Sequence, residues 1–360
     1  MANSSWRIAR VLSFALYYSG ALWLFERLDR GRKPGPRCTV LSYHRIADER
    51  VGYRDIAVSP EAFRNHIGHL TGRGYRFLTL HEYTEYIAGR LTLDCDSVLL
   101  TFDDGYRDNF AAALPILRAA GAHATIFVVT GAIEDGAALW WDRVTSIVRA
   151  LRTSSDPVVD TAGGIPEGIA RSLPEARGGD DRAACQAIAS MVDAMKPLSA
   201  TDREVVLVAL EALVPSLPAL DLMLTWDMLE KMREAGFDVG AHTVTHPMLS
   251  LVAVQEAVAE ITGSKRMLEQ RLGTPVTSFA YPYGKADMFT DETIIALENA
   301  GFACAFTTEN GRDEPGAYPY RLRRNGMRDA PAYVLAVRMS GLFEHPALSR
   351  ARSWIERRRG

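Results

Sequence analysis

Short apolar segments alternate with longer stretches of helical periodicity along most of the chain, and this alternation restricts the fold more than any other feature. Segments that predict strands lie at 38–43, 98–102, 124–129, 237–241 and 303–306, with a further strand leading into Tyr283. Helical patterns lie at 60–74, 80–89, 110–120, 226–236, 252–272 and 291–301. Strands and helices that alternate in this way pack as a parallel sheet with the helices outside it. We therefore expect an α/β fold.

Composition is compatible with one large core. The chain has 360 residues, 48% of them hydrophobic, and single barrels commonly reach such sizes. A net charge of −3 and a pI near 6.3 argue against a nucleic-acid partner. The cysteines show no metal-binding spacing, and we expect them to be reduced core residues: Cys38, Cys95, Cys185 and Cys304.

The run Thr-Phe-Asp-Asp-Gly at 101–105 follows an apolar strand, which delivers Asp103 and Asp104 to a strand end. Some 140 residues later, His242 and His246 follow another apolar segment. We expect His242 at a strand end and His246 on the first turn beyond it, with both imidazoles on one face if the segment is helical. Strand ends are where barrel enzymes carry their active sites.

One carboxylate and two imidazoles form a ligand set that leaves coordination positions open, as catalytic metal sites do. We assign Asp104, His242 and His246 as metal ligands. Asp103 is then placed to act as the base toward a metal-activated water. Each motif alone also suits an ordinary turn or a helix surface. Their occurrence together, with a third strand and Pro/Gly turn at 279–285, favours the metal site.

With these three motifs in this order, the chain resembles the polysaccharide deacetylase family, which has the NodB homology domain and is also called carbohydrate esterase family 4. The resemblance covers roughly residues 38–330 and implies a distorted (β/α)7 barrel. It implies that Asp103 is the base, that Asp104 binds the metal, and that Tyr283 donates its backbone N–H to the oxyanion. Zinc is the expected ion, with cobalt or nickel as alternatives.

The chain departs from the family pattern in its third motif, where alanine replaces the arginine that holds the catalytic aspartate. The exopolysaccharide-associated branch of the family resembles this chain there and takes the arginine from a later strand. We predict Arg321 as the partner of Asp103, with Arg323 as the alternative. An arginine on a solvated strand edge is the competing interpretation of Arg321.

The family's late histidine motif, which protonates the leaving amine, has no good match. His44, at the end of the first strand, is our candidate by resemblance to the exopolysaccharide-associated branch. A structural role in packing at the loop start is the alternative for His44. His345 is a weaker candidate for the proton donor.

Three segments flank or interrupt the barrel, which we place at 38–340. An insertion at about 131–225 is expected to form helices beside the barrel mouth, where Trp140 and Trp141 either stack on sugar rings or anchor the insertion. Residues 1–37 form an apolar and basic N-terminal segment, and 341–360 form a basic C-terminal tail.

The apolar stretch at 11–25 is shorter than the ~20 residues that a spanning helix needs, and no signal-peptide cleavage site follows it. We expect peripheral contact with an anionic membrane or, alternatively, an amphipathic helix packed on the barrel. A cytoplasmic protein, peripheral on the inner face of the membrane, is the expectation. An exported, membrane-anchored protein is the alternative.

These observations predict a metal-dependent hydrolase that removes N-acetyl groups from amino sugars of a polysaccharide or a lipid-linked saccharide precursor. Hydrolysis of another amide, such as a cyclic imide or ureide, is the alternative enzyme activity. A degenerate, saccharide-binding member of the family is the non-enzymatic alternative. The presence of all four residues at positions 103, 104, 242 and 246 argues against it.

Overall fold

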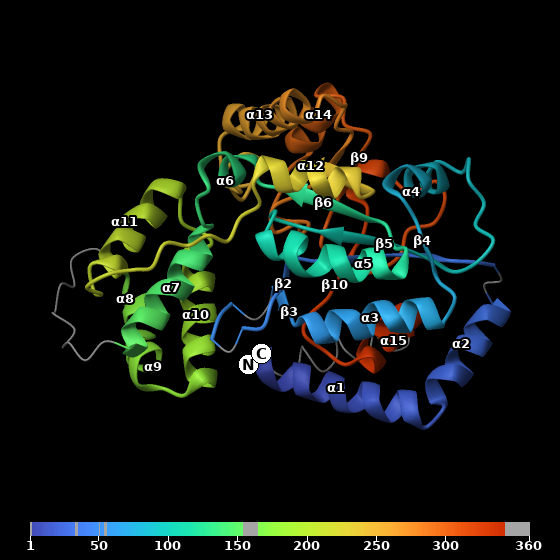
Figure 1. Cartoon of the computed structure of the whole chain (residues 1–360), viewed down its shortest axis with the longest axis horizontal. Coiled ribbons are helices and arrows are strands. Elements are labelled where there is room, and N and C mark those ends of the chain that lie inside the picture. Colours follow the sequence, from blue (N-terminus) through green and yellow to red (C-terminus); the bar gives the residue numbers. More distant parts are fainter. Residues whose placement is uncertain (1, 33–34, 50, 54–55, 154–164, 343–360) are drawn as a thin grey trace.

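A parallel sheet forms the centre of the molecule (Figure 1). The computed structural model describes residues 2–32, 35–49, 51–53, 56–153 and 165–342. Along the sheet the strands are β10 (Asn325–Gly326), β1 (Cys38–Tyr43), β5 (Ser97–Phe102), β6 (Ala124–Val128), β7 (Phe237–Ala241), β8 (Ser278–Ala280) and β9 (Cys304–Phe306). The short β4 (Arg76–Phe77) pairs with the start of β5, and β2 (Arg45–Ile46) pairs with β3 (Ala57–Val58) in a separate small sheet.

One segment brings the two edges of the sheet together. Leu322 forms a parallel bridge with Phe306 of β9, and three residues later Asn325 pairs with Leu41 of β1. The sheet therefore curls toward closure, and the predicted distorted (β/α)7 barrel is confirmed. Residues 323 and 324 therefore lie between the edge strand β9 and the strand β1 at the other side of the sheet.

Helices cover the outside of the sheet (Figure 1). They are α3 (Pro60–Gly72), α4 (Leu80–Ile87), α5 (Leu114–Ala120), α12 (Trp226–Glu234), α13 (Val254–Leu272), α14 (Asp291–Asn299) and α15 (Ala332–Ser340), with a 3-10 turn at Pro319–Arg321. Ser59, Thr79, Thr225 and Thr290 cap four of these helices, each accepting the backbone N–H three residues later. Such caps contribute about 1 kcal/mol each and fix where the helices start.

The insertion forms a helical layer beside the barrel (Figure 1). After α6 (Thr130–Asp135) it contains α7 (Trp140–Thr153), α8 (Glu167–Ala170), α9 (Leu173–Gly178), α10 (Asp181–Met195) and α11 (Ala200–Glu211). Its apolar side chains make a cluster of their own, which includes Tyr106, Val129 and Met223 from outside the α7–α11 helices. The insertion thus packs next to the strand ends that carry the site.

The N-terminal segment forms two helices, α1 (Ala2–Tyr18) and α2 (Ala21–Arg32), along the side of α15 and α3. Among the described residues, no helix combines the length and the hydropathy required to cross a bilayer. None of the four cysteines forms a disulfide with another described residue. Cys38 and Cys304 are buried, whereas Cys95 and Cys185 are only partly buried and are not the core residues that the sequence predicted.

The expected strands and helices are present with shifts of a few residues at their ends, and one element differs in kind. The helix expected at 110–120 begins with a π-helical turn at Asn109–Ala113 before α5. Single π turns inside helices often occur at functional sites. Here the turn buries Asn109, whose side-chain amide donates to the His44 carbonyl at 2.7 Å.

Candidate metal centre and active site

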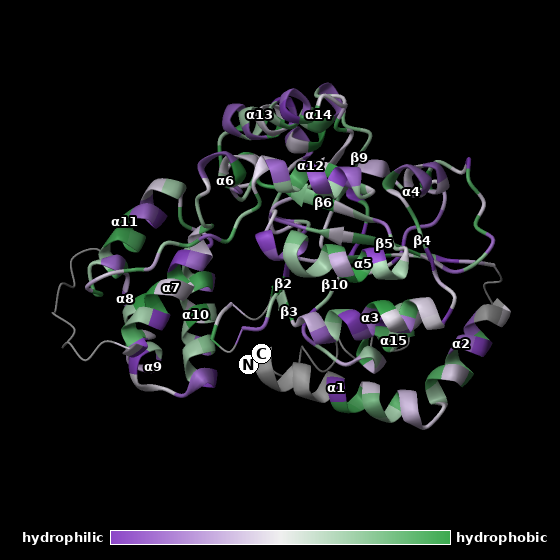
Figure 2. Cartoon of the chain, viewed as in Figure 1, coloured by the Kyte–Doolittle hydropathy of each residue, from purple (hydrophilic) through white to green (hydrophobic). Residues whose placement is uncertain are grey.

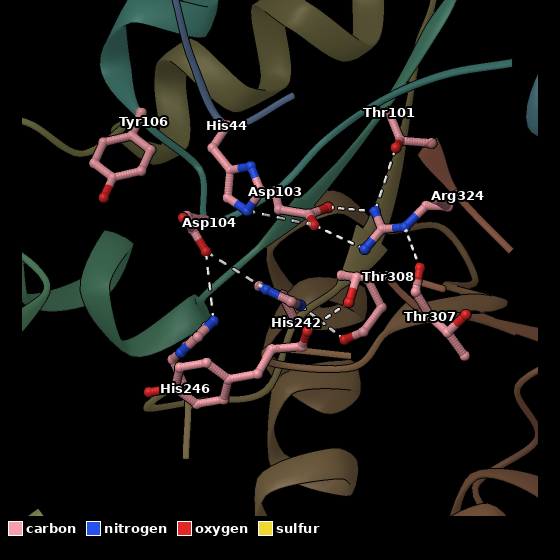
Figure 3. A network of polar contacts seen from close by, with 12 residues as sticks. His44, Thr101, Asp103, Asp104, Tyr106, His242, His246, Thr307, Thr308 and Arg324 are labelled. Atoms are coloured by element: carbon pink, nitrogen blue, oxygen red, sulfur yellow. Dashed lines mark hydrogen bonds and ion pairs between the residues drawn. The ribbon is translucent and has the colours of Figure 1, made fainter. Parts of the chain in front are cut away.

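The predicted ligands meet at the C-terminal ends of the parallel strands (Figure 3). Asp103 and Asp104 follow β5, and His242 follows β7. His44 follows β1, and Tyr283 lies three residues beyond β8. Because parallel strands end at the same edge of a sheet, residues far apart in the sequence are gathered here.

Asp104, His242 and His246 form a buried cluster that fits a divalent ion. Asp104 Oδ1 lies 3.5 Å from His242 Nε2 and 3.6 Å from His246 Nε2. Ligands at the usual bond lengths around a tetrahedral zinc ion are separated by roughly 3.3 Å, close to these values. Both carboxylate oxygens of Asp104 are buried without a hydrogen-bond partner among the described residues, which is costly unless they bind something. The three residues therefore fit a metal site.

Backbone strain is concentrated at the same place. Within the described part of the chain, four residues other than glycine have a positive φ: Asp104, Thr243, His246 and Tyr283. Such conformations cost on the order of 1 kcal/mol or more and persist where the surrounding structure imposes them. All four belong to the ligand motifs or their immediate neighbours, so the fold accepts strain to aim these groups inward.

The segment 242–246 is a loop that begins at the end of β7, so the two imidazoles are not aligned by the helical face that a spacing of four also allowed. Within this loop, Thr243 and His246 adopt left-handed backbone conformations. The buried carboxylate of Glu260, on α13, holds this loop by accepting the backbone N–H groups of Val244 and Thr245 and the Thr245 hydroxyl. The His242 Nδ1 contacts the Ala280 carbonyl at 2.7 Å, which orients its Nε2 toward Asp104.

Asp103 is held by an arginine, as predicted, but this arginine is Arg324 and not Arg321. Its guanidinium makes two parallel bonds to the Asp103 carboxylate, at 2.6 and 2.8 Å, and its Nε donates to the Thr307 carbonyl. Arg324 is fully buried, and its position follows from the closing segment that joins β9 to β1. Arg324 thus takes the place of the arginine that the third motif lacks.

The prediction that Arg321 is the partner of Asp103 was therefore wrong. Arg321 is on the surface, where it pairs with Asp291 at 2.8 Å. The alternative, Arg323, was also wrong, because its guanidinium lies near Asp313 and its side chain is half exposed. Both side chains are about half exposed, whereas that of Arg324 is buried.

His44 lies beside the base, as the sequence suggested. Its Nε2 is 3.9 Å from Asp103 Oδ2, and its side chain is 26% exposed, in contrast to the buried ligands. Its partial exposure places it at the solvent side of the buried centre, and Figure 3 shows it beside Asp103. His345, the weaker candidate, is outside the described residues.

Tyr283 occupies a tight turn beside the ligands. Its ring lies 5.0 Å from that of His246, and the Thr308 hydroxyl donates to its carbonyl. Gly284 follows with φ +65°, and a Cβ there would come within 2.7 Å of the Thr308 nitrogen, so the turn requires glycine. Among the described residues no acceptor contacts the Tyr283 N–H, which leaves this donor available.

The start of α7 forms one wall of the site. Trp141 packs its indole against His246, with ring centroids 4.9 Å apart, and donates from Nε1 to the Tyr106 hydroxyl. Tyr106 in turn donates to Asp142 at 2.9 Å. Trp140 and Trp141 are nearly buried in the insertion's apolar cluster, as the anchoring alternative required.

The charges of the centre suit metal binding. Burial opposes ionisation of Asp104, but the contact with His242 and the nearby imidazoles lower its pKa to about 2. Burial also opposes the charge of Asp103, yet Arg324 keeps the pKa of Asp103 below its usual value. Burial and the neighbouring His242 lower the pKa of His246 to about 3. At neutral pH the carboxylates are ionised and His246 is neutral, which are the protonation states in which carboxylates and imidazoles bind metal ions.

The sequence is similar to those of polysaccharide deacetylases. The sequence profile of the polysaccharide deacetylase family matches residues 90–152 and 182–305, more than half of the chain. A relative from Bacillus subtilis, named "Putative polysaccharide deacetylase YxkH", is 21% identical over 285 residues, 79% of this chain and 69% of the relative. The poly-β-1,6-N-acetyl-D-glucosamine N-deacetylase of Escherichia coli is 33% identical over 79 residues, 22% of this chain and 12% of that protein.

Solved structures share the fold. IcaB from Ammonifex degensii superposes with a TM-score of 0.56 at 21% identity, covering 85% of this chain and 98% of that one. The Streptococcus pyogenes deacetylase PplD gives a TM-score of 0.55 at 19% identity, with 84% and 98% covered. The profile match shows that the chain belongs to the polysaccharide deacetylase family, whose members are hydrolases that act on carbon–nitrogen bonds other than peptide bonds.

Proposed function

We propose that this protein removes N-acetyl groups from amino sugars of an exopolysaccharide or of a lipid-linked saccharide precursor, in a reaction that depends on a divalent metal, zinc by default. The observation that carries the proposal is the side-by-side arrangement of an arginine-held carboxylate and an Asp-His-His cluster. One group suits proton transfer, and the other suits an ion with open coordination positions.

Asp104, His242 and His246 would hold the ion, which when bound supplies Lewis-acid activation of water and of the acetyl carbonyl. Asp103 is ionised and kept in place by two bonds from Arg324, so it can accept a proton from the attacking water. The oxygen of that water forms the new bond to the carbonyl carbon. The backbone N–H of Tyr283 is the candidate donor to the negative charge that develops on the carbonyl oxygen.

The carbon–nitrogen bond breaks when the leaving nitrogen receives a proton. His44 is our candidate for this donor, because its Nε2 lies 3.9 Å from Asp103 and its side chain reaches toward solvent, where substrate arrives. Acetate and a free amino sugar are the products. Asp103 thus assists the attack of water on the carbonyl carbon, and His44 assists the departure of the nitrogen.

The substrate class rests on the relatives. A poly-β-1,6-N-acetyl-D-glucosamine N-deacetylase matches a 79-residue stretch of this chain, which favours an N-acetylglucosamine polymer. The catalytically degenerate alternative loses its main support, because Arg324 replaces the arginine that the third motif lacks.

The test is acetate release from β-1,6-linked N-acetylglucosamine oligomers and from chitooligosaccharides, with a cyclic imide and a ureide in parallel. Metal-supplied protein should release acetate from at least one oligomer, and the His44→Asn variant should release it much more slowly. Turnover of the imide or ureide alone would contradict the proposal and favour the other amide hydrolysis. Wild-type rates for His44→Asn would remove His44 as the proton donor.

A further inference from the structure

Large apolar side chains gather on the outward side of α1 and α2. Seven of the fourteen exposed large hydrophobic side chains in the described part of the chain lie on these two helices. Their exposed fractions run from 49% for Leu12 to 69% for Val11. We call them the outer face: Val11, Leu12, Phe14, Tyr18, Trp23, Leu24 and Leu28. Exposed apolar residues gathered in this way mark an interaction surface.

Packing on the barrel accounts for only part of the outer face. The rings of Phe14 and Tyr18 contact Tyr333 of α15, at centroid distances of 5.6 and 6.1 Å, yet both side chains stay more than half exposed. The main docking contacts of α1 and α2 use other residues. Leu22, only 4% exposed, joins a small cluster with Ala336 and Val337 of α15, and Leu16 and Phe25 pack against that cluster. The two helices therefore have one side docked on the protein and one side turned outward. Figure 2 shows the hydrophobic colouring along both helices at the margin of the molecule.

The charges of the two helices are divided in the same way. Glu26 pairs with Arg73 and Asp29 pairs with Arg37, so both acidic side chains are engaged by the body of the protein. Arg10 and Arg27 are exposed, and the Arg27 guanidinium lies over the Trp23 ring at 5.5 Å. The outer face thus carries apolar side chains and amphipathic aromatic rings, and exposed cations lie next to it in the sequence of both helices.

We propose that the outer face lies in the interfacial region of a membrane that contains anionic lipids, with α1 and α2 parallel to the bilayer plane. Amphipathic helices bind such surfaces through an apolar face, and tryptophan and tyrosine rings favour the headgroup level. Arg10 and Arg27 then meet anionic headgroups. A second copy of the chain fits less well, because a two-fold contact through this face places the same cations of both copies in one interface.

The experiment is flotation of the full chain with phosphatidylcholine vesicles, with and without phosphatidylglycerol. We expect the chain to float with the anionic vesicles and much less with the neutral ones. Trp23→Ser with Leu24→Ser should abolish flotation. Arg10→Gln with Arg27→Gln should weaken binding to anionic vesicles about thirtyfold, since each arginine contributes about fivefold, and salt should mimic this loss.

The matched control is Val205→Ser with Val208→Ser on α11, whose side chains are 56% and 55% exposed. This variant should float like the wild type. Thermal unfolding of every variant should match that of the wild type, since only exposed groups change.

Two results would overturn the proposal. One is a wild-type chain that stays with the soluble fraction for both vesicle types. The other is a dimer in solution that the Trp23→Ser, Leu24→Ser variant dissociates, because it would assign the outer face to a second copy. Neither result depends on the deacetylase activity.

Discussion

Replacing Arg324 with alanine tests the proton-transfer half of the site. Arg324 is fully buried and makes two bonds to Asp103, so its loss leaves a buried carboxylate without a partner. Breaking a buried pair in this way costs about 3–5 kcal/mol of stability. Without Arg324 to hold it, Asp103 should also lose most of its contribution to the rate, which is typically 10²-fold or more. Arg324 touches none of the three metal ligands, so metal content should stay the same.

The chain supplies a matched control three residues away. Arg321 pairs with Asp291, but the two side chains are 49% and 82% exposed. Such a surface pair contributes at most about 1 kcal/mol, so Arg321→Ala should keep both stability and rate. Arg324→Lys keeps the charge but loses the forked geometry, and we expect an intermediate rate.

The assays are urea unfolding, metal content and the rate of acetate release from metal-saturated protein. Equal losses of stability and rate in Arg321→Ala and Arg324→Ala would refute the assignment of Arg324 as the partner of Asp103. A wild-type rate of acetate release in Arg324→Ala would refute it too. Should Arg324→Ala fold poorly, combining it with Asp103→Asn should restore much of the stability, because the neutral side chain no longer needs a cation.

Three further predictions concern the surroundings of the metal. Glu260→Gln should weaken zinc affinity about tenfold or more, measured by competition with a chelator, because the carboxylate holds the loop that carries His246; unchanged affinity would contradict this. His246→Ala should abolish metal binding while the chain stays folded, judged by metal analysis and circular dichroism; retained stoichiometric metal would exclude His246 as a ligand. Burial, the largest cause, raises the pKa of Asp142 to about 7. The folded state therefore holds a proton at Asp142 that the unfolded state releases, so the contribution of Asp142 to the stability of metal-free protein should fall by up to about 4 kcal/mol between about pH 4 and pH 7. His246, whose pKa is lowered, contributes in the opposite sense, so the measured quantity is the difference in unfolding free energy between wild type and Asp142→Asn, from urea unfolding at several pH values. A difference that does not change with pH would refute the assignment.

The strand-end motifs were visible in the sequence because they are local. The apolar strand before Asp103 and the one before His242 each fix where their ligand lies, and parallel strands bring these ends together. The geometry of the His242–His246 loop was missed because a spacing of four fits both a helix and a loop. Pro247 was the overlooked signal, since the residue before a proline avoids the helical conformation.

Arg324 was missed because several arginines crowd the segment from 321 to 328. Choosing among them requires knowing which face of the closing segment turns inward. Leu322 and Arg324 are both buried, whereas Arg321 and Arg323 are exposed, which is the alternation of an extended chain. The buried leucine two residues earlier was the available signal. The hydrogen bonds that link Trp141, Tyr106 and Asp142 had no signal in the sequence, because they join the insertion to the barrel through tertiary packing.

The central claim is that Asp104, His242 and His246 bind the metal while Asp103 transfers the proton. It is tested most directly by measuring metal stoichiometry and acetate release together, on wild-type protein and on Asp103→Asn, after chelation and resupply of zinc. The account predicts one ion per chain in both proteins, with acetate release restored by zinc only in the wild type. Asp103→Asn that releases acetate at the wild-type rate, or that no longer binds zinc, would contradict it.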